Sequence, residues 1–168
     1  DALPIQIDTD KYVTELVNYL NLLHISDAAL KELIDYYQTS PDPVVLVFFG
    51  DHQAIWADEG EALLNQLAAN SRYDLEVHRY VTPIMVWANF DISDSYLANI
   101  DQEIMSPNYI APLIADLTGM DTPYYRFLRD MYSHVPAINA RGIMDSDGNY
   151  YELGSDEIPE DIQKWVDE

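Results

Sequence analysis

The sequence predicts an α/β fold, with a mainly parallel sheet flanked by helices and a small antiparallel hairpin near the C-terminus. Two apolar runs, at 44–49 and 84–87, lack the polar alternation of a half-exposed strand and are typical of strands buried on both faces. Segments with helical periodicity alternate with these runs, which indicates α/β layers. Asp147-Gly148 supplies the turn of the hairpin.

Two helices are predicted before the first strand. Apolar residues recur at spacings of three and four from Val13 to Leu23, and a second helix is expected to start at Ser26 and to run to Tyr37. His24 would then lie at the C-terminal end of the first helix, where the helix dipole favours a histidine. The segment Ser40-Pro41-Asp42-Pro43 ends the helical pattern.

The same patterns extend through the rest of the chain, which we expect to form one domain over residues 1–168. Gly119 is a stop signal between the fourth and fifth helices, and His134 lies near a predicted helix end, where it would act as a cap. The remaining predicted elements are a helix at 59–69, a strand at 83–89, a loop at 91–106, helices at 108–117 and 123–132, the hairpin at 142–153 and an acidic helix at 159–166.

Composition excludes several functions. Eight Lys and Arg against thirty Asp and Glu give a net charge of −22, which disfavours nucleic acid and an anionic membrane surface as partners. The absence of cysteine excludes disulfides, thiolate metal sites and a cysteine nucleophile. We expect a soluble fragment without membrane contact, because no apolar run reaches the roughly 20 residues of a membrane helix. No signal peptide is evident, and the chain begins without Met, which suggests an excised segment.

The residues most suggestive of chemistry are Gly50-Asp51-His52, which directly follow the first strand. Ligands of open α/β sheets bind beyond the carboxyl ends of strands. Asp51 offers a carboxylate oxygen and His52 an imidazole nitrogen, a pair that suits Zn²⁺ or Mn²⁺, with Mg²⁺ or Ca²⁺ left open. Two residues cannot complete a coordination sphere, so further ligands must come from elsewhere. The alternative is a capped turn with a surface histidine.

Four segments, taken in order, resemble one enzyme family. They are 43–53, with Gly-Asp-His after its strand; 80–92, with Thr82-Pro83 before an apolar strand that ends in Trp-Ala-Asn; 108–114; and 124–128. Over roughly residues 12 to 140 the chain is similar to the C-terminal part of sulfatase-like and lipoteichoic-acid-synthase-like enzymes of the alkaline phosphatase superfamily.

The resemblance implies attack on a phosphate or sulfate ester by a metal-activated Thr or Ser, with Asp51 and His52 among the metal ligands. In the family the nucleophile and further ligands lie in an N-terminal portion, and nothing before residue 44 resembles it; Thr14 and Thr39 lack a strand-end context. We therefore expect no catalytic residue here, a partner in the missing N-terminal part of the same catalytic domain, and an inactive fragment. The parent would lie on the extracellular face of a bacterial cell membrane.

Other interpretations remain open at this stage. The chain could be a non-catalytic extracellular domain that binds a cell-wall glycan or a protein. It could also be a free-standing acidic structural protein, although the ordered resemblance would then be unexplained. His78 precedes the second strand and could approach the site, but a solvent-facing side chain is the simpler expectation. The 145–149 segment has the acidic character of a calcium loop, but its glycine comes too early for an EF-hand and a hairpin turn is preferred.

Overall fold

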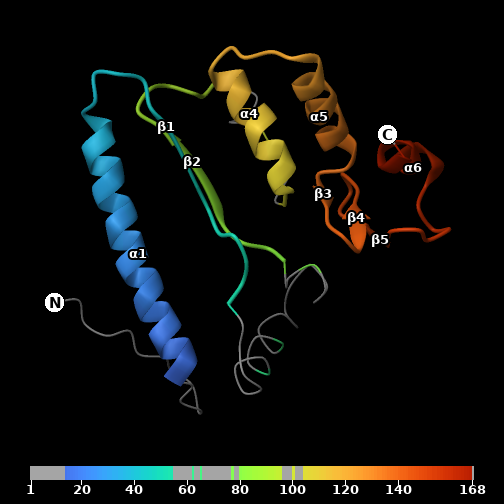
Figure 1. The fold of residues 1–168 in the computed structure, drawn as a ribbon, viewed down its shortest axis with the longest axis horizontal. Helices are drawn as coiled ribbons and strands as arrows, with labels where there is room; N and C mark the ends of the chain where they lie inside the picture. The colour runs from blue at the N-terminus through green and yellow to red at the C-terminus, as the bar shows by residue number, and fades with distance from the viewer. Residues whose placement is uncertain are drawn as a thin grey trace. The chain divides into compact units, whose positions relative to one another are not determined.

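The computed structural model describes residues 14–54, 62, 65, 77, 80–95, 100 and 104–167. The chain divides into two compact units, Asp1–Phe90 and Asp91–Glu168, which are described separately (Figure 1). Both helices and strands occur, in agreement with the predicted α/β class. The organisation of residues 1–168 as a single domain stays a prediction.

The first unit begins with one helix where the sequence predicted two. Helix α1 runs from Thr14 to Gln38 without interruption. The sequence predicts a helix start at Ser26, but a serine inside a helix costs only about half a kcal/mol, and no Gly or Pro is present in α1 to break the pattern. The predicted place of His24 at a helix end is therefore wrong, because it lies in the middle of α1 with its side chain exposed.

The two strands of the first unit pair in the opposite sense to the one predicted. Strand β1 (Val45–Phe49) is antiparallel to β2 (Ile84–Ala88), and the two lie side by side in Figure 1. No parallel pair occurs among the described strands. Apolar runs mark a buried strand but carry no information on direction, so the prediction of a mainly parallel sheet had no direct support. The C-terminal end of β1 consequently adjoins the N-terminal end of β2, with Phe49 opposite Ile84.

Asn89 holds the other end of this pair. Its side-chain oxygen accepts a hydrogen bond from the Val44 amide at 2.8 Å. Its side-chain nitrogen faces three backbone carbonyls, of Tyr37 at 3.2 Å, Ser40 at 3.4 Å and Asp42 at 2.9 Å. One amide thus joins the end of α1, the loop after it and the start of β1, which explains an asparagine directly after β2.

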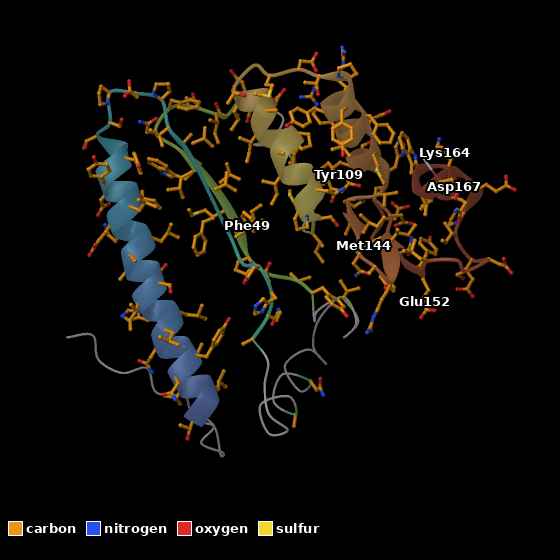
Figure 2. The ribbon with its side chains drawn as sticks, viewed as in Figure 1. Phe49, Tyr109, Met144, Glu152, Lys164 and Asp167 are labelled. Atoms are coloured by element: carbon orange, nitrogen blue, oxygen red, sulfur yellow. The ribbon has the colours of Figure 1, made fainter. Side chains whose placement is uncertain are left out.

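The second unit packs short helices on a core of its own. The elements are η2 (Pro107–Tyr109), α4 (Ile110–Leu117) and α5 (Pro123–His134), and Thr122 caps α5 by accepting from the Tyr125 amide at 3.1 Å. Tyr109, labelled in Figure 2, is fully buried and donates to the Val135 carbonyl at 2.7 Å. Burial raises the pKa of Tyr109 to about 12. Around it pack Leu113, Leu128, Met131 and Tyr132.

A three-stranded antiparallel sheet and a last helix complete the second unit. The order is β3 (Ala137–Ile138), β4 (Gly142–Met144) and β5 (Tyr150–Glu152), followed by α6 (Glu160–Asp167). The hairpin and final helix are confirmed, whereas β3 was not predicted because two residues are too few for a pattern. His134 lies at the end of α5, as expected, but the C-cap residue is Val135 and the His134 ring stacks on Trp165 at 5.0 Å between centroids, so its predicted capping role is not shown.

Two predicted segments lie largely outside the described residues. Of the helix predicted at 59–69, only Ala62 and Asn65 are described, and both are helical. His78 also lies outside the described residues. In the predicted loop at 91–106, the described residues belong to neither a helix nor a strand. Among the described residues, no helix is at once long and apolar enough to span a bilayer.

Candidate functional site

The Gly50-Asp51-His52 turn leaves the sheet at the end of β1, directly after Phe49 (Figure 2). Because β1 and β2 are antiparallel, this turn lies against the segment that enters β2. The Gly50 amide donates to the Pro83 carbonyl at 3.1 Å, which extends the ladder by one bond beyond Phe49. The turn is therefore anchored to a segment more than thirty residues further along the chain.

Two side chains reinforce this anchoring. The Thr82 hydroxyl donates to the Gly50 carbonyl at 2.8 Å. The Gln53 side-chain amide donates to the Val81 carbonyl, so residues on both sides of Asp51 and His52 are tied to the entry of β2. Gly50 is required by close packing, since a Cβ added at this position would lie 2.9 Å from Thr82 Cβ. Its φ is not positive, so access to the left-handed backbone region is not the reason for a glycine here.

The predicted ligands Asp51 and His52 are held close together and face solvent. The Asp51 Oδ1 accepts from the His52 backbone amide at 2.9 Å. The His52 Nδ1 lies 2.8 Å from the Gln53 carbonyl, so a proton on Nδ1 leaves the Nε2 lone pair available. Nε2 and Asp51 Oδ2 are 3.6 Å apart, and the two side chains are 73% and 85% exposed.

This geometry fits one divalent cation bound by both side chains. Two ligands about 2.1 Å from a tetrahedral ion lie roughly 3.4 Å apart, close to the observed separation. Zn²⁺ and Mn²⁺ accept the combination of carboxylate oxygen and imidazole nitrogen. A hydrogen bond from Nδ1 to a carbonyl is the usual outer-sphere support of a ligating histidine.

The pair by itself is an incomplete site. Across the described part of the chain, no third His, Cys, Asp or Glu joins a group able to hold a metal. His24, in α1, belongs to no such group either. A complete site would need at least one further ligand.

Asp145 lies in the 145–149 segment, which has the acidic character of a calcium loop. Its carboxylate is fully hydrogen-bonded within the hairpin turn. Its carboxylate accepts four hydrogen bonds, and the side chain is only 7% exposed. The donors are the amides of Asp147 and Asn149, the Asn149 side chain and the Tyr151 hydroxyl. Burial raises the pKa of Asp145, but the hydrogen bonds, chiefly those from Asn149, outweigh it and leave the pKa below its ordinary value. The hairpin interpretation is confirmed.

The model of the sulfatase family matches residues 6–120, more than half of the chain. The chain belongs to the sulfatase family. The match includes the Gly50-Asp51-His52 turn, β2 and α4, and it ends before α5 and the C-terminal sheet. No curated protein and no solved structure matches significantly.

Sequence reasoning singled out the two candidate ligands of this sulfatase-family chain but missed the hydrogen bonds by which Thr82 and Gln53 tie the turn to the entry of β2. Thr82 and Gln53 lie 32 and 28 residues, respectively, from their hydrogen-bond partners. Neither residue type is distinctive in a single sequence. Their position next to the turn became visible only with the antiparallel pairing of β1 and β2.

Proposed function

We propose that this chain supplies part of the metal site of a sulfatase-family enzyme that acts on phosphate or sulfate esters. The observation that supports it is the Asp51–His52 pair, in which Asp51 Oδ2 and His52 Nε2 lie 3.6 Å apart on a turn that is anchored to the entry of β2. Members of the family commonly bind a divalent metal. With a net charge of −22 the chain repels an anionic ester, and a bound cation would offset that repulsion locally.

The role of each residue follows from its chemistry. Asp51 would hold the ion through Oδ2, while Oδ1 keeps its bond to the His52 amide. His52 would hold it through Nε2, oriented by the contact of Nδ1 with the Gln53 carbonyl. When bound, a divalent ion supplies a Lewis acid that activates a nucleophile and neutralises ester oxygens.

Asp51 and His52 do not amount to a complete catalyst. We propose that the nucleophile and the remaining ligands come from the N-terminal part of the same catalytic domain, and that residues 1–168 alone do not turn over an ester. Thr14 starts α1, and Thr39 follows it with its hydroxyl on the Tyr36 carbonyl, so neither lies at a strand end. The parent would act as a phosphoglycerol transferase, phosphatase or sulfatase on the extracellular face of a bacterial membrane. The family match does not favour a glycan-binding or partner-binding domain.

The test is Mn²⁺ binding to the full 168-residue chain, measured by titration calorimetry and by the electron paramagnetic resonance signal of free Mn²⁺. We expect weak binding of about one ion, abolished by Asp51→Asn and by His52→Gln. Asp42→Asn and His24→Gln are matched controls, because both side chains are exposed in the same unit and lie away from the turn. Equal Mn²⁺ binding in all four variants would contradict the proposed metal site, and ester hydrolysis by the purified chain would contradict the proposal that it is inactive alone.

A further inference from the structure

We infer that Thr82 is the positioning residue of the Asp51–His52 pair, acting through the Gly50 carbonyl. The inference rests on the proposed metal-binding function. It extends that function by naming a side chain outside the Gly-Asp-His turn on which the geometry of the pair depends.

Both candidate ligands are largely exposed to solvent. Side chains that are 73% and 85% exposed are not held by packing, so their orientation has to come from the backbone that carries them and from local hydrogen bonds. Asp51 is tied to the turn backbone by the His52 amide, and the His52 ring by the Gln53 carbonyl. The directions of both ligands therefore follow the peptide planes of residues 50–53.

Thr82 sets the first of those planes. Its Oγ1 donates to the Gly50 carbonyl at 2.8 Å, and this carbonyl belongs to the peptide that joins Gly50 to Asp51. The Gly50 amide is held separately by the Pro83 carbonyl at 3.1 Å. With both polar groups of Gly50 held by consecutive residues of the facing segment, the chain enters Asp51 in one orientation.

Close packing adds to the hydrogen bond. Thr82 Cβ and Cγ2 would lie 2.9 Å and 3.3 Å from a Cβ at residue 50, so only glycine allows the threonine to approach this carbonyl. Thr82 is also partly buried, which makes its hydroxyl bond stronger than one exposed to water. Glycine at 50 and threonine at 82 therefore form a matched pair, and the pairing of β1 with β2 brings them together.

The experiment compares Thr82→Val, Thr82→Ser and Thr39→Val in the full chain. Valine keeps the branched shape and removes the hydroxyl, whereas serine keeps the hydroxyl. Thr39→Val is the matched control, because it removes a threonine hydroxyl bonded to a backbone carbonyl elsewhere in the same unit. Losing outer-sphere support typically weakens metal affinity by 10- to 100-fold. We expect Mn²⁺ affinity to fall about 10-fold in Thr82→Val. In Thr82→Ser and Thr39→Val it should stay within about 3-fold of the affinity of the unsubstituted chain.

A second measurement does not depend on metal. In metal-free protein, amide hydrogen exchange at Asp51 and His52 should accelerate in Thr82→Val. The thermal midpoint and the exchange of α1 should stay close to those of the unsubstituted chain. Thr82→Ser should restore slow exchange at both amides. A general loss of stability would instead accelerate exchange throughout the unit.

The outcomes separate this inference from the proposed function. Full Mn²⁺ affinity in Thr82→Val, with binding lost in Asp51→Asn, would overturn the role of Thr82 and leave the proposed function standing. Equal losses in the valine and serine variants would also overturn it, because the hydroxyl would not be the cause. If the unsubstituted chain binds no Mn²⁺, the proposed function fails, and amide exchange alone decides the role of Thr82. Faster exchange at Asp51 and His52 in Thr82→Val supports that role, and unchanged exchange overturns it.

Discussion

The two units of this chain differ in how their apolar residues are used. In the second unit Tyr109 and Ile143 are fully buried in adjoining clusters (Figure 2 labels Tyr109). In the first unit Val17 is the one buried apolar residue among those described, and Phe49, at the end of β1, is 49% exposed. Among the residues that the structure describes, the unit that carries the candidate ligands is thus held mainly by backbone pairing and polar side chains, whereas the other is held by a core.

This difference explains why the candidate site depends on individual hydrogen bonds. A two-stranded antiparallel sheet is marginal unless other elements support it. Asn89 secures one end of β1 and β2, and Thr82 with Gln53 secures the other. Polar ties of this kind orient the Asp51–His52 turn without burying it.

The largest expected contrast comes from truncating one apolar side chain in each unit. Leu113→Ala should destabilise the second unit by about 2–5 kcal/mol, because Leu113 is almost fully buried and its loss leaves a cavity. Phe49→Ala should cost about 1 kcal/mol or less, because half of that side chain already contacts water. Segment-resolved hydrogen exchange in increasing urea measures each unit separately. Equal losses in the two variants would contradict the comparison.

Asp145→Asn should have the next largest effect, about 1–3 kcal/mol on the second unit at pH 7. The Asp145 carboxylate accepts hydrogen bonds from four donors, whereas the side-chain nitrogen of asparagine is itself a donor. Some of these hydrogen bonds would therefore be lost. Because the pKa of Asp145 is held below its ordinary value of 3.8, its contribution is present above that pH and is lost as the pH falls through the folded-state pKa. Urea melts from pH 7 to pH 2.5 should therefore show the two proteins converging at acid pH.

Asn89→Asp should destabilise the first unit by about 1–2 kcal/mol. The carboxylate still accepts from the Val44 amide, but it places a charged oxygen against three backbone carbonyls. Asn139→Asp is the control, because the Asn139 side chain accepts from the amides of Arg141 and Gly142, a role that aspartate keeps. Faster amide exchange at Val44 and Val45 in Asn89→Asp alone would support the tie, and identical exchange in both variants would refute it.

The smallest effect is expected for the exposed ion pair of α1. Lys31 and Asp35 are four residues apart on the helix, and both side chains are largely exposed to solvent. Such pairs contribute roughly 0.3–0.5 kcal/mol, so Lys31→Ala should change stability by less than about 0.5 kcal/mol. A larger loss of stability in Lys31→Ala, measured by the same exchange experiment, would contradict this prediction and show that the Lys31–Asp35 ion pair contributes substantially to α1.

Local pattern was sufficient for most elements, whereas the assignment of Asp51 and His52 as metal ligands stays a prediction. The strands at 45–49 and 84–88, the helices at 110–117 and 123–134 and the C-terminal hairpin all lie where periodicity, capping residues and turn chemistry predicted them. It failed at Ser26, where a residue that favours helix starts was tolerated within α1. It also failed for β3, whose two residues are recognisable only by their pairing with β4.

The sequence by itself determined most of the helix and strand positions and the exclusion of thiol chemistry, because these follow from residue types and short spacings, and it predicts Asp51 and His52 as metal ligands. The tertiary structure alone decided that β1 and β2 are antiparallel, since strand direction depends on how the chain returns and leaves no mark in an apolar run. That pairing brings Thr82 to Gly50 and Asn89 to Val44, contacts across 32 and 45 residues. Hydrogen bonds over such separations leave no local pattern in the sequence, yet they secure both ends of the strand pair, and the Thr82 bond lies at the candidate site.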